Sequence, residues 1–227
     1  MVSNSSLDER ATAVEIGGLV DGVGAPVMRA AYSLKAKPSW ITLSSVEGKG
    51  NSQVDVTAPV YKGREGRSGS ITVAVEDLTE EVSIQQSGSN IWDVTTQSLA
   101  FVKTGEAKKF TGNANLASIT FSVDSDASAW LTVGKLVVNT KQYNSGAAIE
   151  GDPGASNIYP FEITFTAAAN PTVDTRSGHV TVNGQKYTVT QAAGDATLSV
   201  SPTSLTFTAA GETKQITITT NTAWTIS

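Results

Sequence analysis

Few side chains in this sequence could carry acid–base or nucleophilic chemistry. His179 is the only histidine and there is no cysteine, which removes a thiol nucleophile and thiolate metal ligands. No Gly-x-Ser-x-Gly motif accompanies His179, and a strand histidine without a positioned partner does not meet the geometry of a catalytic base. Two carboxylates would suffice for a glycosidase, but small β-sandwich domains offer no deep cleft. We therefore predict that the protein is not an enzyme and uses no cofactor.

Two pairs of acidic residues have the spacing found in calcium loops. They are Asp124-Ser-Asp126 and Glu150-Gly-Asp152. Neither pair continues into the Asp-x-Asp-x-Asp-Gly run that would complete a set of oxygen ligands. We expect solvated turns at both places and predict no metal site.

Three tyrosines are the best candidates for contact with a carbohydrate: Tyr61, Tyr143 and Tyr159. An exposed aromatic ring can cover the C–H face of a sugar, and each of these residues lies in a predicted loop or beside one. The alternative interpretation is that they are ordinary loop tyrosines. Three tryptophans are flanked by alternating apolar residues instead, which favours core packing for Trp40, Trp130 and Trp224.

The charge of the chain argues against nucleic acid as a partner. The net charge is −5, and no run of basic residues is longer than the pair Lys108-Lys109. A protein that binds phosphates needs a basic patch, which this sequence lacks. No apolar stretch is long enough to span a bilayer, so we expect no membrane insertion.

The elements that must position these residues are β-strands. Apolar residues alternate with polar ones throughout the chain, for example at Val180/Val182 and Tyr187/Val189. Between these two runs stands Asn183-Gly184, the preferred dipeptide of a type I′ hairpin turn. The sequence predicts an all-β protein, built of tandem immunoglobulin-like β-sandwich domains.

The sequence repeats itself at a period of roughly 100 residues, the size of one sandwich domain. We expect the recurring arginines and glutamines to hold strand ends through hydrogen bonds to the backbone. The recurring blocks are Trp40 with Trp130, Arg67-Ser-Gly with Arg176-Ser-Gly, Gln86 with Gln191, and Ser98-Leu-Ala-Phe101 with Ser204-Leu-Thr-Phe207.

These repeats predict the domain boundaries. Residues 1–30 would form an N-terminal anchor and the irregular opening of a first sandwich at 12–88. A second sandwich would occupy 91–193, with an exposed loop inserted at 134–157, and a partial third repeat would follow at 196–227. Half a sandwich leaves an open edge, so we expect its completion by a longer chain or another polypeptide.

Taken together, the repeated motifs resemble the BACON domain, a β-sandwich family associated with Bacteroidetes and with a proposed carbohydrate-binding role. The resemblance implies the same fold and a binding function here. The residues that carry it are Leu99, Phe101, Gly105, Trp130, Arg176, Gly178 and Gln191 in the second repeat, Trp40, Arg67, Gly69 and Gln86 in the first, and Leu205, Phe207, Gly211 and Trp224 in the third.

The beginning of the chain bears on the setting of this function. Met1-Val-Ser-Asn has neither the basic start nor the apolar run of a secretory signal. Because BACON-like domains occur in gut phage proteins as well as in their hosts, we predict a structural or adhesive protein of a bacteriophage virion, made in the host cytoplasm. It would be a capsid decoration, fibre or tail accessory.

The predicted partners are other virion proteins or further copies of the chain, bound through the N-terminal segment and the third repeat, together with surface glycans. The alternative is a secreted or outer-surface carbohydrate-binding or spacer module of a Bacteroidetes glycan-utilisation protein.

Overall fold

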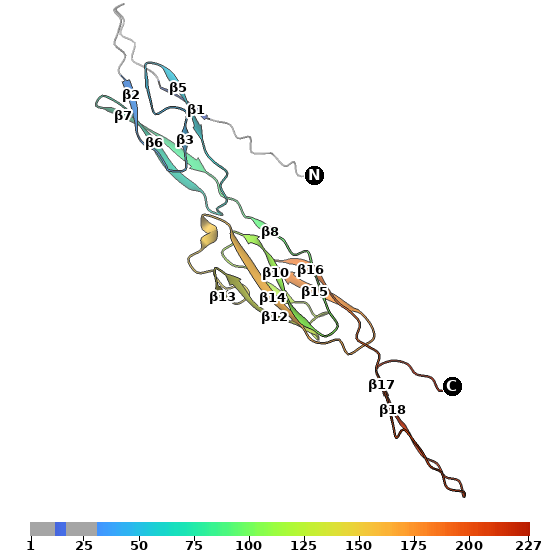
Figure 1. The fold of residues 1–227 in the computed structure, drawn as a ribbon. Helices are drawn as coiled ribbons and strands as arrows, with labels where there is room; N and C mark the ends of the chain where they lie inside the picture. Colours follow the sequence, from blue (N-terminus) through green and yellow to red (C-terminus); the bar gives the residue numbers. More distant parts are fainter. Residues whose placement is uncertain (1–11, 17–30) are drawn as a thin grey trace, which may run out of the picture. The chain divides into compact units, whose positions relative to one another are not determined.

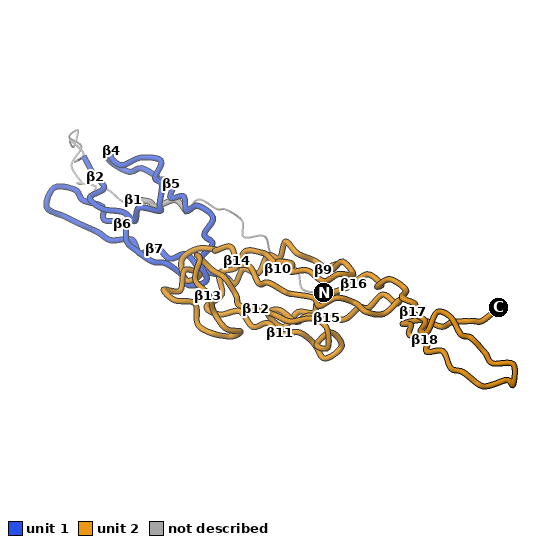
Figure 2. The backbone as a smooth tube through the Cα atoms, turned by 60° about the horizontal axis from the view of Figure 1, so that its bottom comes forward, with its two compact units in different colours: residues 1–89 blue, residues 90–227 orange. Residues whose placement is uncertain are grey.

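The computed structural model describes residues 12–16 and 31–227, which divide into two compact units, 1–89 and 90–227 (Figures 1 and 2). Both units are built from β-sheets packed in layers, so the predicted fold class of tandem immunoglobulin-like β-sandwiches is confirmed. The predicted N-terminal anchor at 1–30 lies outside the described residues, except for the strand Thr12–Ile16.

Unit 1 pairs a three-stranded sheet with a four-stranded one, and all of its ladders are antiparallel. The first sheet runs β1 (Thr12–Ile16), β5 (Ser52–Thr57), β3 (Thr42–Leu43). The second runs β4 (Glu47–Lys49), β2 (Ala31–Ala36), β6 (Arg67–Val75), β7 (Leu78–Gln86).

The core of unit 1 is small and mostly aliphatic. Alternation along β5 and β6 turns every second side chain inward, as the period of a strand requires. The buried set is Tyr32, Ile41, Val54, Val56, Ile71 and Val73.

Unit 2 pairs a five-stranded sheet with a four-stranded one. The first runs β13 (Lys141–Tyr143), β12 (Leu131–Val138), β14 (Tyr159–Ala167), β10 (Glu106–Ala114), β8 (Trp92–Val94). The second runs β11 (Phe121–Val123), β15 (Arg176–Val182), β16 (Gln185–Gln191), β9 (Ser98–Phe101). Strand β9 lies parallel to β16, whereas the other pairs are antiparallel.

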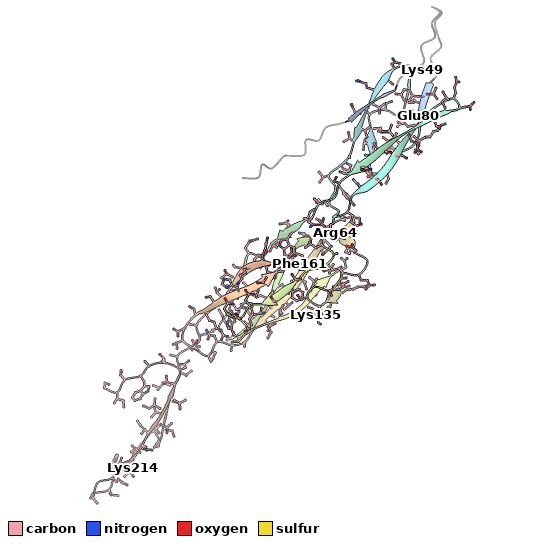
Figure 3. The ribbon with its side chains drawn as sticks, turned by 180° about the vertical axis from the view of Figure 1, so that it is seen from behind. Lys49, Arg64, Glu80, Lys135, Phe161 and Lys214 are labelled. Atoms are coloured by element: carbon pink, nitrogen blue, oxygen red, sulfur yellow. The ribbon has the colours of Figure 1, made fainter. Side chains whose placement is uncertain are left out.

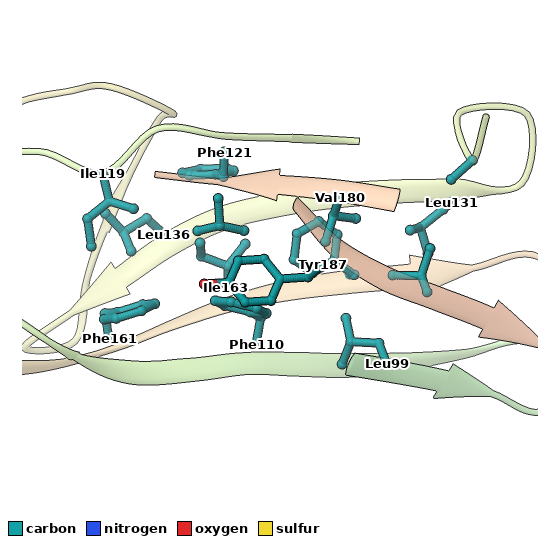
Figure 4. Close-up of a cluster of buried hydrophobic side chains, with 14 of the residues drawn as sticks. Leu99, Phe110, Ile119, Phe121, Leu131, Leu136, Phe161, Ile163, Val180 and Tyr187 are labelled. Atoms are coloured by element: carbon teal, nitrogen blue, oxygen red, sulfur yellow. The ribbon is translucent and has the colours of Figure 1, made fainter. Parts of the chain in front are cut away.

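Aromatic rings fill the space between the two sheets of unit 2. Phe110 of β10 is fully buried and lies 4.7 Å from the ring of Tyr187, 6.3 Å from Phe161 and 6.5 Å from Phe165, measured between ring centroids. Leu99 of β9 points into the same cluster (Figure 4). Burial of such large rings removes a large apolar area from water and so stabilises this unit.

The turn between β15 and β16 is the one that the sequence predicted. Asn183 and Gly184 have φ values of +48° and +75°, both in the left-handed region that a type I′ turn requires. Val182 pairs with Gln185 directly beside this turn, so the Asn-Gly dipeptide sets the register of the hairpin.

The predicted exposed loop at 134–157 is only partly a loop. Strand β12 continues to Val138, and β13 follows it. Leu136, Val138 and Ile149 are 0%, 1% and 4% exposed, and Gly154 of the short 3-10 helix Pro153–Ala155 lies so close to Asn115 that a Cβ would be 2.1 Å from its carbonyl oxygen. Glycines and a proline suggested an exposed segment, but its apolar residues cover one end of the core.

The residues after 196 form a two-stranded hairpin, β17 (Leu198–Ser201) and β18 (Thr217–Thr220). Leu198 pairs with Thr220. In the second sandwich Trp92 pairs with Ala114, and each of these two residues lies 106 positions before its counterpart in the hairpin. The third repeat therefore reproduces the β8–β10 pairing of the second.

Candidate functional site

An arginine, a tryptophan and a glutamine meet at one end of the four-stranded sheet of unit 2. Arg176 begins β15 and pairs with Gln191, which ends β16. The Arg176 Nε–H donates to Gln191 Oε1 at 2.8 Å, and the guanidinium lies 4.8 Å from the ring centroid of Trp130. Gln191 in turn donates to the carbonyls of Val102 and Ala168, both at 2.9 Å.

The same cluster recurs in unit 1. Arg67 pairs with Gln86 across the β6–β7 ladder, and its Nε and Nη2 donate to Gln86 Oε1 at 2.9 and 2.7 Å. The guanidinium lies 4.2 Å from the ring centroid of Trp40. The sequence predicted that these arginines and glutamines bond the backbone. In the structure they also bond each other, and each arginine stacks on the tryptophan of its own unit.

The glycine of the Arg-Ser-Gly motif has a steric role in both units. A Cβ on Gly178 would lie 2.8 Å from Ala127 Cβ, and a Cβ on Gly69 would lie 2.5 Å from Pro38 Cγ. These contacts come from the segments that lead to Trp130 and Trp40. The absence of a side chain therefore lets the tryptophan-bearing segment cross close above the strand.

Tyr61 adds a second ring to the cluster of unit 1, and the sequence did not predict this contact. The Arg67 guanidinium lies 4.3 Å from the ring centroid of Tyr61, so one cation contacts both Tyr61 and Trp40. Both rings are half-buried. Arg64 lies in the same connection between β5 and β6 (Figure 3), with Nη2 3.3 Å from the carboxylate of Glu65. Tyr61 is the predicted carbohydrate-contact residue with the best-defined polar and aromatic surroundings.

The other two predicted tyrosines lie apart from this cluster. Tyr143 on β13 is half-buried and packs against the core of unit 2. Tyr159 begins β14, is 2% exposed, and donates its hydroxyl hydrogen to the carbonyl of Leu116 at 2.5 Å. This placement corrects the sequence-based prediction for Tyr159, because a ring enclosed in the core has no free face for a sugar.

His179 does have a partner, which its sequence context did not reveal. Nδ1 lies 2.7 Å from Asp126 Oδ2, and the backbone N–H of His179 donates to Asp126 Oδ1 at 3.0 Å. These two hydrogen bonds hold the pKa of Asp126 below its ordinary value. Nearby, Asp124 accepts hydrogen bonds from Thr181 and Lys186, of which the Thr181 bond contributes most to lowering its pKa.

This pair leads to a prediction on pH and stability. A carboxyl group whose pKa is depressed by folding stabilises the protein above its unfolded pKa, here 3.8, and loses that contribution as the pH falls through the folded value. Asp126→Asn should therefore lower the melting temperature at pH 7, and its difference from the wild type should shrink below about pH 4. Thermal unfolding of both proteins from pH 3 to 7 measures this, with Asp174→Asn as the exposed control. A difference that does not change with pH would contradict the prediction.

Within residues 12–16 and 31–227, no three side chains of the metal-binding types come together. Glu150 forms an ion pair with Lys141, with an oxygen–nitrogen distance of 2.8 Å. In the described part of the chain, no helix has the length and apolar character needed to cross a membrane.

No curated protein matches the chain. Solved structures that align with the chain include domains 4 and 5 of the S-layer protein SbsC, at 9% identity, with a TM-score of 0.31 and coverage of 78% of each chain. A protein of unknown function from Porphyromonas gingivalis W83 has 10% identity and a TM-score of 0.24, covering 73% of this chain and 85% of that one. The I9–I11 tandem of titin has 11% identity and a TM-score of 0.20, covering 84% and 62%.

One family model also matches the sequence. It is BACON, described as "Putative binding domain, N-terminal", and it matches residues 30–87 and 118–192. The first match contains the cluster of Trp40, Arg67 and Gln86, and the second contains Trp130, Arg176 and Gln191. Since the two matches cover more than half of the chain, this protein belongs to the BACON family of binding domains.

Proposed function

We propose that this chain is a non-catalytic binding and spacing module that contacts glycans through Tyr61. The observation that carries the proposal is the cluster in which Arg67 lies 4.3 Å from the Tyr61 ring and 4.2 Å from the Trp40 ring. The guanidinium restricts the orientation of the tyrosine ring, so less conformational entropy is lost when a ligand stacks on it. Membership of a family of binding domains supports the same function.

The neighbouring polar groups also suit a sugar. Glycans are recognised by aromatic faces together with hydrogen-bonding groups at the edge of the ring. In unit 1 the connection that carries Tyr61 also carries Lys62, Arg64 and Glu65. In unit 2, Ala168 takes the position of Pro59, and Asn170 takes the position of Tyr61. Asn170 is buried, and its side-chain amide donates to the carbonyls of Asp174 and Ala192 at 2.8 and 3.0 Å. The proposed site therefore belongs to unit 1.

Binding to a glycan array tests this proposal. Tyr61→Ala should reduce binding of the full chain at least tenfold, which corresponds to about 1.4 kcal/mol. Trp224→Ala removes an aromatic side chain that is 52% exposed in the third repeat and should leave binding unchanged. Tyr143→Ala tests the other half-buried tyrosine and should also bind normally. Equal binding by Tyr61→Ala and the wild type would refute a role for Tyr61.

We also propose that the chain is part of a bacteriophage virion, because BACON-like domains occur in gut phage proteins as well as in their hosts. Peptide mass spectrometry of purified phage particles would detect the chain if it is a virion protein. Its recovery from the outer surface of a Bacteroidetes cell, and not from particles, would favour the glycan-utilisation alternative.

A further inference from the structure

Strand β7 of unit 1 is the counterpart of β16 in unit 2. Each strand ends with the glutamine that bonds the motif arginine across the ladder, Gln86 in β7 and Gln191 in β16. Strand β16 has a neighbour on both sides, because β9 pairs with it in parallel from Ser98 to Phe101. In the described residues of unit 1, β7 pairs with β6 alone. Within the described residues, the outer edge of β7 therefore has no paired strand, whereas the same edge of β16 is paired with β9.

The side chains beside this edge are more exposed than their counterparts. Val189 and Gln191 are 0% and 1% exposed, whereas Ile84 and Gln86 at the same positions of β7 are half-buried. Trp130 is 6% exposed and meets Phe101 of β9 edge to face at 6.4 Å between centroids. Its counterpart in unit 1 is the half-buried Trp40.

An apolar pocket opens into the core of unit 1 beside β7. Its lining includes Val56, Ile71 and Val82. Val56, which pairs with Leu43, is the counterpart of Phe165, which pairs with Val133 in unit 2. Val82 is the counterpart of Tyr187. Valines therefore stand where unit 2 has two core aromatics, so an added strand would meet smaller apolar side chains here than β9 meets in unit 2.

In unit 2, β9 directly precedes β10, and its buried side chains are those of Leu99 and Phe101. The sequence ahead of β1 contains no such Leu-x-Phe pair.

The chain does contain a second β9-type segment, at Ser204-Leu-Thr-Phe207. It forms no strand in the structure, and Phe207 is 54% exposed. The turn that follows it is already formed as in unit 2. In the third repeat, Thr208 N–H donates to Glu212 Oε1 at 3.0 Å, and Gly211 has a φ of +78°. In unit 2, Val102 N–H donates to Glu106 Oε1 at 2.9 Å, and Gly105 has a φ of +82°.

We propose that residues 204–207 of one copy of this chain add as a parallel strand to the β7 edge of a second copy. Leu205 would lie beside Ile84 and Phe207 against Trp40, as Leu99 lies beside Val189 and Phe101 against Trp130. Strand addition to an exposed sheet edge gains main-chain hydrogen bonds, and side-chain pockets give it specificity. Because donor and acceptor are different surfaces, the contact is head-to-tail and can extend beyond a dimer.

The structure also indicates how to block the acceptor edge without breaking unit 1. In unit 2, Ala192 N–H donates to the carbonyl of Phe101 at 3.1 Å, so the N–H of Thr190 two residues earlier faces β9 as well. The counterpart of Thr190 is Gln85, which is exposed. Gln85→Pro removes an N–H that points away from β6, and proline is tolerated at such an edge position.

Size-exclusion chromatography with light scattering on the full chain, over a series of concentrations, tests the proposal. The wild type should form dimers and larger species. The donor variant Leu205→Ser/Phe207→Ser and the acceptor variant Gln85→Pro should each stay at the monomer mass of 23.6 kDa. A mixture of the two variants should give a dimer of twice that mass and nothing larger, because only one intact donor and one intact acceptor remain.

A control variant separates this contact from general hydrophobic association. Trp224→Ser/Ile226→Ser removes side chains that are 52% and 75% exposed in the same repeat but lie outside the donor segment, so it should assemble like the wild type. A wild type that is monomeric at every concentration overturns the proposal. So does a donor variant that assembles normally, or a mixture that stays monomeric. Amide exchange that protects Gln85 in a monomeric wild type would show pairing within one chain, which also overturns it.

Discussion

Replacing Phe110 by alanine is expected to lower the free energy of unfolding of unit 2 by about 3–5 kcal/mol. Phe110 is 0% exposed and contacts three other rings, of which Tyr187 lies 4.7 Å away between centroids. The substitution removes the transfer free energy of a phenyl ring and leaves a cavity that two facing sheets cannot close, since strands on both sides are fixed by their ladders.

Native-state hydrogen exchange of the β10 and β14 amides measures this loss for unit 2 separately from unit 1, which global unfolding would not do in a chain with two units. Phe110→Leu should cost clearly less, because it retains most of the apolar volume. Val102→Ala, at a residue that is 48% exposed, should change stability by less than about 0.5 kcal/mol. A loss below about 1 kcal/mol for Phe110→Ala would mean that the ring is not part of a packed core.

Replacing Gln191 by leucine is expected to destabilise unit 2 by about 1–3 kcal/mol. Gln191 is 1% exposed and accepts a hydrogen bond from Arg176 Nε at 2.8 Å. The carbonyls of Val102 and Ala168 keep second donors, Gly105 N–H and Arg176 Nη2, both at 3.1 Å. The group left without a partner is therefore the Nε–H of Arg176, beside the ring of Trp130.

The equivalent change in unit 1, Gln86→Leu, is the matched comparison. Gln86 is half-buried, so water can reach the groups that it would leave unpaired, and the loss should be smaller. Arg176→Lys should reproduce most of the Gln191→Leu effect, because lysine lacks the planar fork that bonds Gln191 while stacking on Trp130. Equal losses for Gln191→Leu and Gln86→Leu, each measured by hydrogen exchange of its own unit, would contradict the dependence on burial.

The sequence by itself determined the features that depend on local rules. Period-two alternation identified β15 and β16 and their inward faces, because successive residues of a strand point to opposite sides. Asn183-Gly184 specified the turn between them, because these two residue types tolerate positive φ. Comparing the chain with itself matched Leu99 and Phe101 to Leu205 and Phe207, a relation that needs no coordinates.

The tertiary structure decided which of these residues are covered by others. Tyr159 was predicted in an exposed place and is buried, and Leu136 and Val138 lie in the core although glycines follow in the same segment. Alternation says which side of a strand a residue takes, but not whether a second layer lies over that side. The stacking of Tyr61 on Arg67 joins residues from a connection and a strand.

The difference between β7 and β16 is of the same kind. Both sequences read as strands that end in glutamine, and only the arrangement of their neighbours shows that β16 is paired on two sides and β7, within the described residues, on one. The alternation within a strand shows which of its side chains share a face. Whether its hydrogen-bonding edges are paired depends on segments far away in the sequence, so the local sequence does not indicate it.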